Sequence, residues 1–173
     1  GKIIAGRGKI THWNVKPIGD IGNDEFCKPQ CKDKTEDCLI VASYDGQGPA
    51  NFAHPSGYRL SMQSDGNLVI YKGGKATWAT ATNGRGATNY VMQDDGNLVL
   101  YNSDEIPISI WASSGDYSHS MNPTRDYSLD SSKAPYGLYM NGYGELTIKD
   151  KAKNIVWRNM NNYTQVNGKI ISG

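Results

Sequence analysis

The chain contains 173 residues, of which 38% are hydrophobic, and this suits one domain with a modest core. Lys and Arg number 18 against 17 Asp and Glu, for a formal net charge of +1, which argues against a nucleic-acid partner. No apolar stretch approaches the roughly 18 residues of a membrane-spanning helix, so we expect no membrane insertion. The 20 glycines and 7 prolines indicate short strands joined by tight turns, and we predict an all-β chain.

The first feature along the chain is a group of cysteines in the segment CKPQCKDKTEDC: Cys27, Cys31 and Cys38. The simplest interpretation is one intrachain disulfide, which leaves one thiol over. Reduced structural thiols are an alternative. So is a zinc site completed by His12, although the C-x3-C-x6-C spacing is not a standard zinc pattern. We predict that residues 1–39 are an N-terminal extension packed on a main domain over residues 40–173.

A short repeat dominates the rest of the chain. Its copies are residues 58–71 (YRLSMQSDGNLVIY), 88–101 (TNYVMQDDGNLVLY) and 136–149 (YGLYMNGYGELTIK). They share M-(Gln/Asn)-x-x-G-x-L-x-(Ile/Leu). A tryptophan follows each copy: Trp78, Trp111 and Trp157. Residues 113–135, rich in Ser, Asp, Asn and Pro, separate the last two copies. Three copies of a β unit suggest a closed, threefold β architecture.

The first copy predicts a β-hairpin whose three-residue loop, residues 64–66, ends in a left-handed Gly66. This loop places Gln63 opposite Asn67, and alternation then sorts the side chains onto two faces. One face is apolar: Leu60, Met62, Leu68 and Ile70. The other is mixed: Ser61, Gln63, Asn67, Val69 and Tyr71. A two-residue loop would scramble both faces, so the clean sorting supports the three-residue loop.

The mixed face has the chemistry that a pyranose requires. Amides and a carboxylate offer hydrogen bonds to vicinal hydroxyls, while an isopropyl group covers ring carbons. The second copy repeats the set at identical offsets: Gln93, Asp95, Asn97, Val99 and Tyr101. A solvated turn needs its glycine but not the same five other residue types twice. Such a site is shallow, so we expect weak single-site affinity and a gain from multivalency.

MQSDGNLVIY and MQDDGNLVLY resemble the Q-x-D-x-N-x-V-x-Y signature of the bulb-type (monocot) mannose-binding lectins, as do the following W-A-T and W-A-S. The resemblance covers residues 40–160. It implies a β-prism II fold with three four-stranded sheets around a pseudo-threefold axis, and tryptophans packed near that axis. It also implies mannose binding without metal, cofactor or catalysis. The implied contacts to sugar hydroxyls come from Gln63, Asp65, Asn67 and Tyr71, with Val69 on ring carbons, and from their counterparts in the second copy.

The third copy departs from the signature, with these residues at the five positions: Asn141, Tyr143, Glu145, Thr147 and Lys149. The scaffold positions Met140, Gly144, Leu146 and Ile148 are kept. We therefore predict a site that is silent or retuned, so that changes at Tyr143 or Glu145 leave mannose affinity unaffected. The family often bridges repeats with a disulfide, and no cysteine lies in that position here.

The leading hypothesis is a secreted, extracellular lectin that binds mannose, mannose-terminated glycans and glycoproteins through two sites, as a homodimer or higher oligomer. An alternative is a lectin-like bacteriocin, toxin or defence protein that targets a cell-surface polysaccharide. A storage protein on the same scaffold is a third possibility. On the lectin hypothesis, Asn67→Ala combined with Asn97→Ala abolishes mannose binding and leaves thermal stability nearly unchanged.

Overall fold

The computed structural model describes residues 31–115, 129–159, 163–166 and 169–172. Their secondary structure is almost entirely β, with one short 3-10 helix, η2 (Ser131–Lys133). The strands are β1 (Cys38–Ala42), β2 (Asn51–Ala53), β3 (Tyr58–Met62), β4 (Leu68–Lys72), β5 (Lys75–Ala79), β6 (Asn89–Met92), β7 (Leu98–Tyr101), β8 (Ser109–Ala112), β9 (Gly137–Met140), β10 (Leu146–Lys149), β11 (Ile155–Arg158), β12 (Tyr163–Val166) and β13 (Lys169–Ser172).

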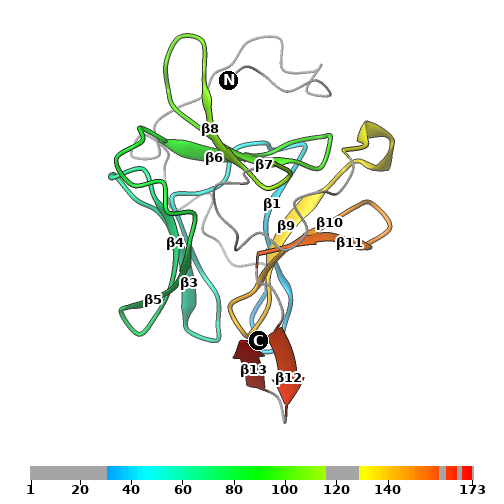
Figure 1. Cartoon of the computed structure of the whole chain (residues 1–173). Coiled ribbons are helices and arrows are strands. Elements are labelled where there is room, and N and C mark those ends of the chain that lie inside the picture. The colour runs from blue at the N-terminus through cyan, green and yellow to red at the C-terminus, as the bar shows by residue number, and fades with distance from the viewer. Residues whose placement is uncertain (1–30, 116–128, 160–162, 167–168, 173) are drawn as a thin grey trace.

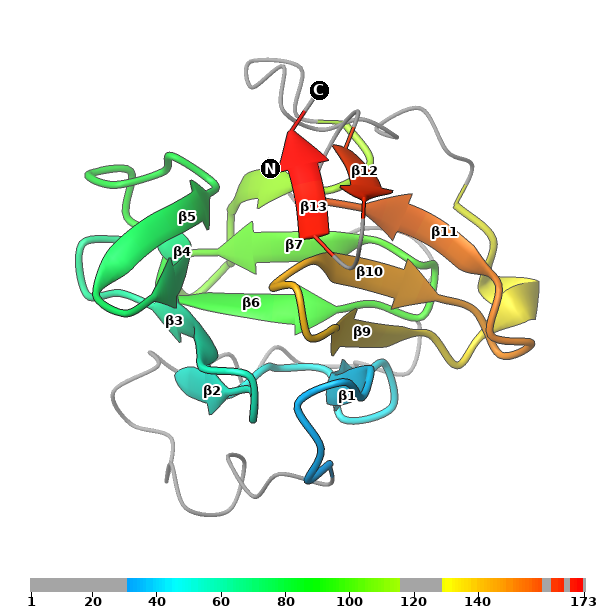
Figure 2. The same cartoon turned by 90° about the horizontal axis from the view of Figure 1, so that it is seen from below.

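Three antiparallel sheets form the sides of a prism, one sheet for each repeat (Figures 1 and 2). The strand orders are β2-β3-β4-β5, β6-β7-β8 and β1-β9-β10-β11, and β12 pairs separately with β13. Because β1 joins the sheet of the third repeat, the start of the prism closes onto its end. The predicted all-β prism with one sheet per repeat is confirmed, and no helix among the described residues has the length and apolar character to cross a membrane.

The second sheet has three strands where four were expected. The segment at its open edge makes one isolated bridge, between Gln47 and Val91, and the Gly48 N–H donates to the Tyr90 carbonyl at 2.9 Å. The next residue, Pro49, has no N–H with which to continue a ladder. The approach is also close, since a Cβ on Gly48 would lie 2.0 Å from the Tyr90 ring. Gly48 and Pro49 therefore disfavour a fourth strand here, and the pairing is limited to one bridge.

The hairpin of the first repeat has the predicted register. Leu60 pairs with Ile70, and Met62 with Leu68. The Gln63 N–H donates to the Asn67 carbonyl at 2.9 Å across the three-residue loop. Gly66 has φ 91°, in the left-handed region that glycine adopts without strain. The turn residue therefore sets which side chains face outward.

The apolar faces of the three hairpins meet in one core. Their buried members are Leu60, Met62, Leu68, Ile70, Tyr90, Met92, Leu98, Leu100, Leu138, Met140, Leu146 and Ile148. Trp78, Trp111 and Trp157 come from the last strand of each sheet, and Trp111 makes edge contacts with the other two, at centroid distances of 6.3 and 6.2 Å. Each such pair contributes about 0.5–1.5 kcal/mol beyond its buried area. The tryptophans are core residues, as the family resemblance implied.

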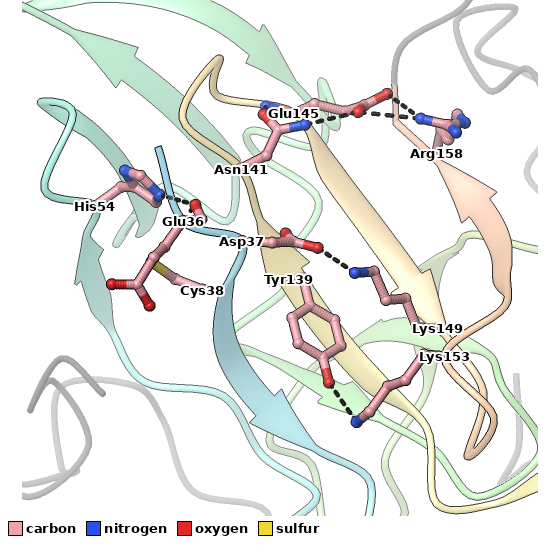
Figure 3. Close-up of polar contacts among 10 residues, drawn as sticks. All are labelled: Glu36, Asp37, Cys38, His54, Tyr139, Asn141, Glu145, Lys149, Lys153 and Arg158. Atoms are coloured by element: carbon pink, nitrogen blue, oxygen red, sulfur yellow. Dashed lines mark hydrogen bonds and ion pairs between the residues drawn. The ribbon is translucent and has the colours of Figure 1, made fainter. Parts of the chain in front are cut away.

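A disulfide joins Cys31 to Cys38 just before and at the start of β1, which confirms the predicted local link. Beside it lies buried His54, whose Nδ1 accepts from the Ser56 N–H at 2.9 Å. Nε2 therefore carries the hydrogen and donates to the Glu36 carbonyl at 2.8 Å (Figure 3). These bonds attach the segment before β1 to the turn after β2.

Other predictions for the N-terminal segment concern residues that are not described. Cys27 and His12 both lie there, so the leftover thiol and the alternative zinc site have no structural account. Among the described residues, Cys31, Cys38 and His54 form a compact group of metal-ligand types, but both sulfurs are in the disulfide. The division into residues 1–39 and 40–173 stays a prediction, and its boundary falls within β1.

Candidate functional site

The outer face of the first sheet brings together the five signature residues of the first repeat. Gln63 precedes the hairpin loop, Asp65 lies in it, and Asn67, Val69 and Tyr71 follow on the return strand. Asp65 is exposed, the two amides and the phenol are half-buried, and Val69 is 2% exposed. The result is an apolar floor with polar groups around it, open to solvent.

Internal hydrogen bonds hold both amides of this first site. The Tyr71 hydroxyl donates to Gln63 Oε1 at 3.0 Å. The Thr82 N–H donates to Asn67 Oδ1 at 3.2 Å, and because a backbone N–H only donates, the contacting Asn67 atom is its oxygen. Neither Gln63 Nε2 nor Asn67 Nδ2 has a hydrogen-bond acceptor among the described residues. The site therefore presents two amide N–H donor groups outward.

Asp65 supplies the complementary acceptor. Its Oδ1 accepts from the Asn67 N–H at 3.0 Å, and its backbone carbonyl accepts from the Gly84 N–H at 2.7 Å. These bonds hold the loop and leave an exposed carboxylate beside the two amide donors. A pair of vicinal hydroxyls can accept from amides and donate to a carboxylate at the same time.

The second site repeats this arrangement on β6 and β7. The Tyr101 hydroxyl donates to Gln93 Oε1 at 2.6 Å, and the Ser114 N–H donates to Asn97 Oδ1 at 3.2 Å. In addition, Gln93 Nε2 donates to Asp95 Oδ1 at 3.2 Å, so two groups of the site bond to each other. The two sites differ most in the exposure of their polar side chains, which are exposed or half-buried in the first site. In the second site all five side chains are only 0–3% exposed: Gln93, Asp95, Asn97, Val99 and Tyr101.

The third face holds an ion pair where the other sites hold a neutral amide. Glu145, 1% exposed, replaces asparagine, and Arg158 Nη1 lies 3.2 and 3.1 Å from its two carboxylate oxygens (Figure 3). Asn141 Nδ2 donates to Glu145 Oε1 at 2.9 Å. The carboxylate is thus neutralised and hydrogen-bonded by its own chain.

The tyrosine position of the third face holds a lysine. Lys149 forms an ion pair with Asp37, and its Nζ lies 4.7 Å from the centroid of the Tyr139 ring. Lys153 Nζ donates to the Tyr139 hydroxyl at 3.0 Å, and this bond raises the pKa of Lys153. The cations of this face are therefore engaged by neighbouring side chains (Figure 3).

Hydroxyl residues after the first two tryptophans support the sites, a role that the sequence interpretation missed. Thr80 Oγ1 accepts from the Leu68 N–H at 3.2 Å and donates to Asn67 Oδ1 at 3.2 Å. Ser113 Oγ makes the same two bonds in the second repeat. The W-A-T and W-A-S triplets carried this signal, because a hydroxyl residue lies two positions after both Trp78 and Trp111.

Comparisons with known proteins place the chain among sugar-binding relatives. A scan of protein-family models and a search of curated proteins found no match. Among solved structures, the chain is similar to monomeric monocot mannose-binding lectins from Gastrodia elata, at 30% identity over 69% of this chain and 94% of that one, with a TM-score of 0.51.

Two further similar structures have lower TM-scores. A lectin from Allium sativum is 31% identical over 64% of this chain and 91% of that one, with a TM-score of 0.46. The mannose-specific agglutinin from snowdrop (Galanthus nivalis) bulbs, complexed with methyl-α-D-mannoside, is 26% identical over 75% and 95%, with a TM-score of 0.41.

Proposed function

The chain belongs to the bulb-type (monocot) mannose-binding lectins, and we propose that it binds mannose and mannose-terminated glycans, without catalysis, at the first repeat. One observation carries this proposal: the outward amide donors of Gln63 and Asn67 stand beside the exposed carboxylate of Asp65, over the apolar floor of Val69. This set matches a hexose, which needs both donors and acceptors at the rim and an apolar contact below.

We propose the second repeat as a weaker site of the same chemistry. Its residues form the same internal network, with Tyr101 bonded to Gln93 and Asn97 held by the Ser114 N–H. Their near-complete burial means that a sugar has to uncover them first, and the free energy of uncovering subtracts from the affinity. We propose that the third face does not bind mannose, because Glu145 and Arg158 form an ion pair with each other.

The site is small and shallow, so avidity depends on several sites acting together. We therefore propose that the protein assembles as a homodimer or higher oligomer. We also propose that it is secreted and binds glycoproteins on surfaces. The similar Gastrodia elata lectin is described as monomeric, and sedimentation equilibrium of this chain measures its own state.

The test is calorimetric titration with methyl α-D-mannoside. In Asn67→Asp, one side-chain oxygen still accepts from the Thr82 N–H, but the outward N–H donors are replaced by a second carboxylate oxygen near Asp65. We expect affinity to fall at least about tenfold, because the sugar oxygen loses its N–H donor and faces an oxygen that can only accept, and an unpaired polar group of this kind costs about 1–3 kcal/mol.

Two matched variants complete the titration. Asn97→Asp should remove only the weak second site, and Tyr143→Phe on the third face should leave binding unchanged. Undiminished binding by Asn67→Asp would show that the first site is assigned wrongly. Wild-type protein that does not bind the mannoside at all would refute the proposed function.

A further inference from the structure

The first face carries a cation that the equivalent positions of the other faces lack. Arg59 on β3 pairs with Tyr71 across the hairpin. In the second sheet the residue paired with the signature tyrosine is Asn89, and in the third sheet the position is Gly137. This difference lies outside the five-residue signature, so the family resemblance does not account for it.

Neighbouring side chains orient the Arg59 guanidinium. Its Cζ lies 5.2 Å from the centroid of the Tyr71 ring, over the ring, and its Nε donates to Ser61 Oγ at 3.2 Å. Ser61 Oγ in turn donates to Asn51 Oδ1 at 2.6 Å. The Nε of the guanidinium is therefore hydrogen-bonded to Ser61, and one face of the group packs on the Tyr71 ring. The terminal nitrogens make no hydrogen bond within the described part of the chain.

No carboxylate of the described residues forms an ion pair with Arg59. The ion pairs between described residues are Lys149 with Asp37 and Arg158 with Glu145, both on the third face. Arg59 is exposed, so its planar pair of terminal N–H groups is accessible. A guanidinium in this state matches a group with two adjacent anionic oxygens.

Tyr71 links this cation directly to the first sugar site. One face of its ring lies under Arg59, while its hydroxyl donates to Gln63 Oε1 at 3.0 Å within the site. Arg59 and the Gln63 amide of the site are therefore in contact with the same Tyr71 side chain. The cation and the site are thus parts of one continuous surface on the first sheet.

We propose that the first site extends into a subsite at Arg59 that binds an oxyanion, a phosphate or a carboxylate, carried by a mannose-containing saccharide. This inference rests on the proposed mannose binding and adds a preference for anionic over neutral ligands. The guanidinium fork binds two oxygens of the anion, and Tyr71 together with Ser61 holds the fork in place.

The experiment compares mannose 6-phosphate with mannose by calorimetry at low salt. We expect the phosphate ester to bind wild-type protein up to about fivefold more tightly, because an exposed ion pair contributes up to about 1 kcal/mol, and we expect the ratio to shrink at high salt. A mannose disaccharide that carries glucuronic acid, compared with its neutral glucose analogue, distinguishes the carboxylate from the phosphate. A gain in either comparison supports the subsite and identifies the anion.

Three variants test the role of the residue. Arg59→Gln should bring the affinity ratio to about one, and Arg59→Lys should keep part of it, because the charge remains and the fork is lost. Lys75→Gln removes the same charge from an exposed position on β5 and should keep the full ratio. Thermal melts followed by circular dichroism show that each variant is folded.

The outcomes separate this inference from the proposed function. If wild-type protein binds neutral mannose but shows no gain with either anion, or if Arg59→Gln keeps the gain, the subsite is refuted and the lectin function stands. If neutral mannose does not bind at all, both are refuted.

Discussion

Replacing Asn97 by alanine should destabilise the protein more than the same change at Asn67, although both occupy the same position of the repeat. Asn97 Oδ1 accepts from Ser113 Oγ and from the Ser114 N–H, each at 3.2 Å, and the side chain is 2% exposed. Alanine removes this acceptor, which is closed to water, and the Ser114 N–H loses its side-chain partner. Such a loss costs about 1–3 kcal/mol of unfolding free energy.

Asn67 Oδ1 accepts an equivalent pair of bonds, from Thr80 Oγ1 and the Thr82 N–H, each at 3.2 Å. Here the side chain is half-exposed, so we expect water to enter the space that alanine opens and to accept from the Thr82 N–H, although Thr82 itself is buried. Thr82 Oγ1 donates to the Gly66 carbonyl at 2.6 Å and lies 2.8 Å from Thr80 Oγ1, so it can accept the Thr80 hydrogen in place of Asn67. We expect a cost of about 0.5–1 kcal/mol, near the lower end of the net value of a hydrogen bond.

Urea denaturation of the two single variants measures the difference directly. In thermal melts, each kcal/mol corresponds to about 2–4 °C for a chain of this size. The double alanine variant should therefore melt clearly below wild type, which revises the expectation from the sequence of nearly unchanged stability. Equal losses, or a larger loss at Asn67, would refute the reasoning from exposure.

Two further predictions concern stability. Burial, reinforced by the charge of Asp130, raises the pKa of Tyr136 to about 12, above the value near 10 of the unfolded chain. The neutral phenol therefore contributes stability that is complete below pH 10 and is lost as the pH rises toward 12. In urea titrations across this range, the unfolding free energy of Tyr136→Phe should decline less than that of wild type. Equal declines would contradict the assignment. Gly144 and Gly74 have φ of 77° and 81°, and a Cβ would lie 2.4 Å from the Tyr58 ring at Gly144 but meet nothing within 4 Å at Gly74. Alanine at Gly74 should cost about 1–2 kcal/mol of backbone strain. Alanine at Gly144 should cost about 1–3 kcal/mol more, because its Cβ also overlaps the Tyr58 ring. Chemical denaturation measures both costs, and similar values would rule out the close contact with Tyr58.

Much of each hairpin could be predicted because its determinants are local. Gly66 is suited to the left-handed end of a three-residue loop, and that loop sets the register from Gln63 and Asn67 outward. Strand alternation then assigns every side chain to the core or to the outer face. A local disulfide within the cysteine segment was predictable for the same reason, but the sequence left open which cysteines pair, and the structure shows Cys31 with Cys38.

The sequence also indicated that the second sheet lacks a fourth strand, but the repeat led us to expect three equivalent four-stranded sheets. Gly48 and Pro49 are poor strand residues, and the structure places them at the edge next to Tyr90. The repeat predicted three equivalent sheets, but each sheet also needs a strand from outside its own repeat. The identity of that outer segment differs from sheet to sheet.

The sequence by itself determined the repeat, the hairpin register and the identity of the residues in each candidate site, because these depend on neighbours within one hairpin. Only the tertiary structure showed that Asn67 is accessible while Asn97 is covered, and that Arg158 neutralises Glu145. Exposure and charge pairing depend on segments that are distant in the chain and adjacent in the fold. Two copies of one motif therefore acquire different surroundings, and a local pattern cannot contain that difference.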